Sequence, residues 1–262
     1  MSTQTIVITG GAGRIGGYLR SRMRRPDRVL RLADIVPVID PGAGEEVLTG
    51  DLTDRDVVRR AVTGADAVVH LAGIPSESPW PEAVRVNVDG TQAVLDAAVA
   101  AGVDRVVLAS SNHAAGFWER PADGSALPDT VEPRPDTYYG WTKGAIESLG
   151  RLYHDRFGLT VVNLRIGACC DRPTGTLNAQ MWLSPDDVAR LVEASVDPGV
   201  TGFHTVWGMS ANAGRWWSTE GGRAIGFLPQ DDSSRFENEP DPEGPVRVGG
   251  VFCTTPLGHP IR

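Results

Sequence analysis

The sequence is poor in lysine. Of its 25 basic side chains only Lys143 is a lysine, and the other 24 are arginines. Arginine presents a stiff planar fork, whereas lysine presents a compact ammonium on a flexible stem. A chain that uses arginine for every other cation keeps Lys143 for a property specific to lysine, so Lys143 is a candidate functional residue.

Cysteine is also scarce, which excludes a disulfide framework. Two of the three cysteines are adjacent, Cys169 and Cys170, and the third is Cys253, so there is no C-x-x-C motif. This usage suits a reducing compartment, and we expect a cytoplasmic protein. The five histidines are scattered without metal-ligand spacing. No metal site is expected.

Long apolar runs and an excess of positive charge are absent as well. No run approaches the ~18 residues that span a bilayer, and an immediate N-terminal strand leaves no room for a signal peptide. The net charge is −8, which argues against a nucleic-acid partner. We therefore expect no membrane and no nucleic acid as partners. The 262 residues, 41% hydrophobic, suffice for one large α/β domain with a smaller appendage.

The best-defined motif follows the β-branched apolar run at residues 6–8. Gly11, Gly13 and Gly16 fit G-x-G-x-x-G, Gly10 begins a second three-residue spacing, and an amphipathic stretch follows. The pattern predicts a strand, a tight turn and a helix whose N-terminus faces a phosphate. A glycine-rich turn without a ligand is the alternative reading. The position at the start of a βαβ unit favours dinucleotide binding.

Asp34 ends the second expected strand, 18 residues after Gly16. An acidic residue about 20 residues beyond the motif hydrogen-bonds the adenine ribose, and its charge repels a 2′-phosphate. Asp34 therefore favours NAD over NADP. An aspartate that only initiates a turn is the alternative.

Strands and helices alternate between residues 5 and 167. The pattern predicts a doubly wound, Rossmann-type parallel sheet of the α/β class, with strands at 28–34, 46–49, 67–73, 105–110 and 159–166, and helices at 84–100 and 138–157. Ligands of such sheets bind at the carboxyl ends of the strands. The glycine turn, Asp34, Gly73 and residues 110–113 all lie at these ends.

The character of the sequence changes at residue 168. We expect residues 1–167 to form an NAD-binding domain and residues 168–262 a small C-terminal substrate-binding region, with 202–208 returning to the sheet. Residues 209–262 are rich in Gly, Pro and Trp and too apolar for a disordered tail. We expect them to pack over the cleft.

Tyr139 and Lys143 form a Tyr-x-x-x-Lys pair on the expected long helix. Their spacing places both side chains on one face. A nearby ammonium lowers the pKa of a tyrosine, which is ordinarily about 10. Ser111, at the end of a neighbouring strand, can hold the reacting oxygen. The set is suited to moving a proton off a hydroxyl while nicotinamide accepts a hydride.

The glycine motif, Ser110-Ser111 and Tyr139-x-x-x-Lys143 together resemble the short-chain dehydrogenase/reductase superfamily, in its extended, epimerase-like branch. The resemblance covers residues 5 to about 167. It implies that Ser111, Tyr139 and Lys143 are catalytic, with Lys143 also binding the nicotinamide ribose. The residues expected to bind NAD are Gly10, Gly13, Arg14, Ile15, Gly16, Asp34, Asp51, Leu52, Leu71, Ala72, Gly73, Tyr139 and Lys143.

Further segments resemble the uronate dehydrogenase family nearly end to end. They are Arg31-Leu-Ala-Asp34, Ser110-Ser-Asn-His113, Arg165-Ile-Gly167, Trp182-Leu-Ser184, the run from Val206 to Asn212, and Trp216-Trp217. That family oxidises C1 of galacturonate or glucuronate with NAD to an aldarolactone. The resemblance implies a substrate set of Ser76, Ser111, Asn112, His113 and Phe252.

Three positions depart from that family. Pro75 and Ala168 stand where the family has serines, and Leu177 stands where it has the arginine that grips the uronate carboxylate. Arg172, in the same loop as Leu177, is the expected replacement for that arginine, because a bound carboxylate needs a charge-assisted partner. Otherwise the substrate lacks a carboxylate.

The leading hypothesis is an NAD-dependent oxidoreductase of a sugar hydroxyl, with C1 of a hexuronate the first candidate. A dehydrogenase of a neutral aldose or other polyol-like alcohol is the first alternative. A nucleotide-sugar epimerase or reductase is the second, although residues 168–262 leave little room for a nucleotide-diphosphate pocket. A non-catalytic dinucleotide sensor is disfavoured by the complete Ser111, Tyr139 and Lys143 set. A sugar or sugar acid is the expected partner, and the chain is expected to be a homo-oligomer.

Overall fold

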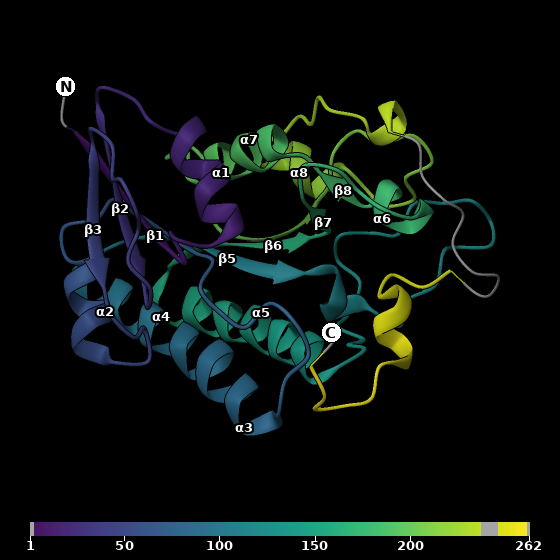
Figure 1. The fold of residues 1–262 in the computed structure, drawn as a ribbon, viewed down its shortest axis with the longest axis horizontal. Helices are drawn as coiled ribbons and strands as arrows, with labels where there is room; N and C mark the ends of the chain where they lie inside the picture. Colours follow the sequence, from purple (N-terminus) through teal and green to yellow (C-terminus); the bar gives the residue numbers. More distant parts are fainter. Residues whose placement is uncertain (1–2, 237–245, 261–262) are drawn as a thin grey trace.

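The computed structural model describes residues 3–236 and 246–260. Its centre is a seven-stranded sheet, all parallel, in the order β3-β2-β1-β4-β5-β6-β9. Figure 1 shows α1 and α7 on one face of this sheet and α2, α4 and α5 on the other. The predicted α/β class and doubly wound sheet are confirmed.

The elements run along the chain as follows. The strands of the main sheet are β1 (Gln4–Thr9), β2 (Arg28–Asp34), β3 (Glu45–Thr49), β4 (Ala67–His70), β5 (Arg105–Ser111), β6 (Thr160–Ile166) and β9 (Phe203–Gly208). A second, two-stranded sheet pairs β7 (Ala168–Cys169) with β8 (Trp182–Leu183). The α-helices are α1 (Arg14–Arg22), α2 (Arg55–Val62), α3 (Trp80–Ala83), α4 (Gly90–Ala101), α5 (Tyr138–Phe157), α6 (Thr176–Gln180), α7 (Pro185–Ser195) and α8 (Glu220–Ala224). A π-helical turn spans Val84–Asp89, and 3-10 turns span Asn112–Ala115, Ser233–Arg235 and Gly250–Thr254.

The alternation of apolar side chains along the strands builds a core on each face. In β1, Ile6 and Ile8 pack toward α1 and α7, whereas Val7 packs toward α2 and α4. Both faces of the strand are buried because helices cover both, which explains the continuous apolar runs. Several expected boundaries shift: β4 ends at His70, before the expected end at residue 73, and β5 runs on to Ser111.

The region after residue 167 adds a third apolar cluster at the carboxyl edge of the sheet. Its buried members include Trp207 on β9, Trp216 and Trp217 in the segment after β9, and Val248 near the C-terminus, and they pack with Ala115 and Leu127 from earlier in the chain. β9 pairs in parallel with β6 at the edge of the sheet. This cluster supports the loops that face the candidate site. The division into domains at residue 167 stays a prediction.

Candidate active site

The glycine turn packs through backbone atoms. A Cβ on Gly16 would lie 2.5 Å from the carbonyl oxygen of Gly10, and one on Gly10 would lie 2.8 Å from the amide nitrogen of Ala72. Gly10 also has a φ of +73°, which favours glycine. α1 begins directly after Gly13, which as N-cap provides no side-chain acceptor for the first N–H groups. The turn therefore offers close backbone approach and unsatisfied N–H groups, and these features fit a pyrophosphate.

Asp34 lies at the end of β2 beside this turn. One carboxylate oxygen accepts from the backbone N–H of Ala12 (2.9 Å) and the other from Val36 (3.2 Å). The turn role is compatible with the predicted cofactor role, because each oxygen retains a second lone pair that a ribose hydroxyl can use.

The other expected cofactor residues lie on the same edge. Asp51 accepts hydrogen bonds from the backbone N–H and the hydroxyl of Thr53, and its Oδ2 lies 3.6 Å from the Arg85 Nη1. The hydrogen bonds from Thr53 and the charge of Arg85 lower the pKa of Asp51. Arg14 is exposed, Ile15, Leu71, Ala72 and Gly73 are half-buried, and Leu52 is buried. A Cβ on Gly73 would lie 3.9 Å from the Lys143 Nζ. The loop after β4 therefore lies between the glycine turn and α5, which carries Tyr139 and Lys143.

The structure brings Ser111, Tyr139 and Lys143 together at the carboxyl end of β5. Thr137 caps α5 by accepting from the N–H of Gly140. The Lys143 Nζ donates to the carbonyl of Ala109 (2.7 Å) and lies 5.6 Å from the centre of the Tyr139 ring. All three side chains are buried. The geometry provides a hydroxyl, a phenol and an ammonium in one enclosed site.

The direction of the Tyr139 pKa differs from the expectation. Burial raises the pKa of Tyr139 to about 12, a hydrogen bond with Ser111 opposes this rise, and the charge of Asp136 adds to it. The ammonium that was expected to lower it is itself buried, and burial lowers the pKa of Lys143 to about 8. Desolvation dominates because both groups lie in the same low-dielectric site.

Asn112, His113 and Phe252 line the same site. The Asn112 amide donates to the carbonyl of Val248 (3.0 Å), which ties the C-terminal segment to the end of β5. The His113 ring stacks on Phe252 with centroids 3.9 Å apart, and it meets the Tyr139 ring edge-on at 5.7 Å. The C-terminal segment therefore forms a wall beside Tyr139, the predicted catalytic tyrosine.

The remaining substrate candidates lie less centrally. Ser76 is half-buried in the loop before α3. Arg172 is exposed, and its guanidinium lies over the ring of Phe236, 5.7 Å from the ring centre. The structure does not bring it to His113 or Phe252. Leu177 instead lies close to the C-terminal segment, since a Cβ on Gly250 would be 2.9 Å from its Cδ2.

Three positioning residues escape detection from the sequence. Glu77, only 1% exposed, accepts from the backbone N–H of Tyr139 (2.9 Å) and of Gly258 (2.6 Å). Asn87, on the π-helical turn, accepts a hydrogen bond from the backbone N–H of Ile74 and donates one to its carbonyl. Asp136 contacts His113. No motif marks them, although π-helical turns are frequent at functional sites.

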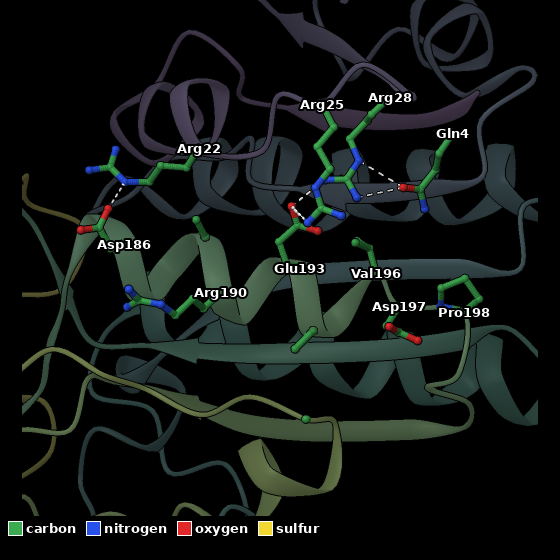
Figure 2. A pocket seen from close by; sticks show the side chains of 13 residues that line it. Gln4, Arg22, Arg25, Arg28, Asp186, Arg190, Glu193, Val196, Asp197 and Pro198 are labelled. Carbon is green, nitrogen blue, oxygen red and sulfur yellow. Dashed lines mark hydrogen bonds and ion pairs between the residues drawn. The ribbon is translucent and has the colours of Figure 1, made fainter. Parts of the chain in front are cut away.

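An open hollow of about 760 Å³ lies elsewhere, between α1 and α7. Figure 2 shows that three of its arginines are paired with acids inside it: Arg22 with Asp186 (2.5 Å), and Arg25 and Arg28 with Glu193 (2.8 and 2.6 Å). None of the predicted site residues lines it. The Ser111, Tyr139 and Lys143 cluster therefore stays the candidate active site.

A parallel sheet with a glycine turn, beside a buried serine, tyrosine and lysine, defines the class of nicotinamide-dependent oxidoreductases. Residues 6–170 match the NAD dependent epimerase/dehydratase family. The chain belongs to this family, the extended branch of the short-chain dehydrogenases, and is an NAD-dependent oxidoreductase. Among residues 3–236 and 246–260, no helix is long and apolar enough to cross a bilayer.

Several sugar dehydrogenases are similar to this protein over almost the whole chain. Uronate dehydrogenase of Pseudomonas putida is 37% identical over 95% of both chains. NAD-dependent glucose-6-phosphate dehydrogenase of Haloferax volcanii is 38% identical over 91% of this chain and 98% of its own. The structure of a mutant uronate dehydrogenase of Agrobacterium tumefaciens with NAD superimposes with a TM-score of 0.89 at 35% identity, covering 97% and 98% of the two chains. The predicted NAD cofactor is confirmed.

Proposed function

We propose that the protein oxidises the C1 hydroxyl of a pyranose sugar with NAD, with a hexuronate such as galacturonate or glucuronate as the first candidate and an aldarolactone as product. The observation that carries the proposal is the contact of His113 with both Tyr139 and Phe252. This contact places an imidazole and an aromatic ring directly beside the proposed acid/base residue. The family resemblance and the uronate dehydrogenase relatives support the uronate.

The site residues divide the reaction among them. Tyr139 takes the proton of the sugar hydroxyl, and Ser111 holds the hydroxyl oxygen. The Lys143 ammonium stabilises the phenolate that forms, because its charge lies near the ring in a buried site. Gly10, Gly13, Gly16 and Asp34 hold NAD, and bound NAD supplies the hydride acceptor.

A neutral aldose is the second candidate, and Leu177 favours it. Leu177 approaches the backbone of Gly250, two residues before Phe252, at the position where the uronate dehydrogenases have their carboxylate-binding arginine. Arg172, the expected substitute, lies over Phe236. A wall with an apolar residue here suits a substrate without a carboxylate.

The deciding measurement is kcat/KM for D-galacturonate against D-galactose, followed by NADH formation. A preference for galacturonate supports a hexuronate as the substrate. In that case Arg172→Ala should raise the KM for galacturonate roughly ten- to a hundredfold, because a hydrogen bond to a charged group is lost. Arg223→Ala, a change at an arginine on α8, is the matched control. A preference for galactose contradicts the proposal that the substrate is a hexuronate and supports a neutral aldose instead. If neither sugar nor other uronates, aldoses or polyols are oxidised, the proposed function is wrong.

A cytoplasmic location and a homo-oligomeric state stay predictions. The three cysteines are free thiols, which agrees with a reducing compartment.

A further inference from the structure

His113 and Asp136 form a buried pair next to the catalytic tyrosine. The His113 Nδ1 lies 2.6 Å from the Asp136 Oδ2, and the Asp136 side chain has no exposed surface. The other carboxylate oxygen accepts from the hydroxyl of Thr137 (2.9 Å), which also caps α5. The residue that starts the catalytic helix therefore also orients the carboxylate behind His113.

Three glycines enclose this carboxylate. A Cβ on Gly116 or Gly249 would lie closer than 3.0 Å to the Oδ2 of Asp136, and one on Gly140 would lie 2.7 Å from its Oδ1. Gly116 and Gly249 have negative φ angles, −54° and −83°, which any residue can adopt. Their missing side chains are therefore required for space around Asp136 rather than for backbone conformation.

The enclosure fixes the His113 ring in one orientation. Phe252 covers one face of the ring, Tyr139 meets its edge, and Asp136 takes Nδ1. Among the residues that the structure describes, none hydrogen-bonds Nε2, although the His113 side chain is only 14% exposed. Nε2 is thus the one polar atom of the ring left for a ligand.

A carboxylate accepts hydrogen bonds and donates none, so it selects the ring form with the proton on Nδ1. In the neutral ring this leaves a lone pair on Nε2. We propose that Asp136 is a positioning residue that holds His113 with its proton on Nδ1, so that Nε2 accepts a hydrogen bond from a ring hydroxyl of the sugar. The inference deepens the proposed function and rests on it for the identity of the ligand.

The first test needs no substrate. Nitrogen NMR of the ¹⁵N-histidine-labelled protein is recorded well above the ordinary imidazole pKa of about 6.5, and the His113 signals are those lost in His113→Gln. We expect a protonated Nδ1 and an unprotonated Nε2, and a changed pattern in Asp136→Asn. A proton on Nε2 in the unmodified protein, alone or together with one on Nδ1, overturns the proposal.

The second test is a double-mutant cycle on sugar oxidation, with the better of D-galacturonate and D-galactose. Asp136→Asn should lower kcat/KM roughly 10- to 100-fold, as removal of a carboxylate behind a functional histidine does at metal sites. The same change in the His113→Gln background should have little effect, because Asp136 acts through His113. The Kd for NADH should stay unchanged.

Asp129→Asn is the matched control, since Asp129 is a buried aspartate that binds the backbone of Trp207 and Gly221. It should lower the melting temperature without changing KM for the sugar. Equal losses from Asp136→Asn in both backgrounds would show a merely structural role and overturn the proposal. If the unmodified enzyme oxidises no sugar, the proposed function fails, and the NMR result still decides the orientation of His113.

Discussion

The turn at residues 10–16 meets its neighbours mainly through backbone atoms, whereas His113 is held by side chains from separate segments. The glycines of the turn lie in one short segment, and the turn packs against the end of β2 and the backbone of Ala72 just after β4. The wall around His113 combines Asp136 before α5, Tyr139 within it and Phe252 near the C-terminus. A site made by the backbone of one short segment can be recognised from the spacing of its glycines in the sequence. A wall made by side chains from distant loops changes whenever one of these loops changes, and it can therefore set the specificity for the substrate.

The largest effect is expected at Lys143, where the two regions meet. Lys143→Arg keeps the charge but places a wide fork where a compact ammonium donates to the Ala109 carbonyl. We expect kcat/KM to fall by at least ~10²-fold, a common size for the loss of acid/base function. Arg151→Lys, on the exposed part of the same helix, should leave turnover unchanged. Near-normal turnover in Lys143→Arg would show that Lys143 acts only as a cation.

The glycine turn can be tested with two adjacent residues of α1. A Cβ on Gly16 would meet backbone oxygens of Gly10 and Gly11, whereas one on Gly17 meets nothing within 4 Å. Gly16→Ala should destabilise the protein by roughly 1–3 kcal/mol through overpacking and weaken NADH binding. Gly17→Ala should stabilise it by about 0.5–1 kcal/mol, because alanine is the better helix former.

Denaturant unfolding and NADH titration of the two variants measure this difference. Equal free energies of unfolding for Gly16→Ala and Gly17→Ala would mean that the turn tolerates a side chain. The glycine turn would then not differ from the wall around His113 in depending on close backbone packing.

A smaller effect is expected at Glu77, which connects the wall to the catalytic helix. Glu77→Gln replaces one acceptor oxygen by an amide that cannot accept from both Tyr139 and Gly258. We expect a several-fold loss in kcat/KM for the sugar and an unchanged Kd for NADH. Glu82→Gln, at an exposed glutamate on α3, is the control. A weaker NADH affinity without a sugar effect would assign Glu77 to the cofactor side instead.

The sequence by itself determined the fold class, the family and the cofactor. Strand and helix periodicity, the glycine spacing and Asp34 are features of short contiguous segments, so the local chain carries the whole signal. Tyr139 and Lys143 are similar, because a helix brings residues four apart onto one face.

Only the tertiary structure decided what surrounds these residues. The rise in the Tyr139 pKa comes from burial, which no local pattern reports. Arg172 lies over Phe236, which comes from a segment 64 positions further along the chain. No pattern of neighbouring residues reports a contact over such a distance in sequence. Glu77 and Asp136 gain their roles from partners that folding brings to them. Desolvation and long-range contacts exist only in the packed chain, and for this reason the substrate wall could not be derived from sequence spacing.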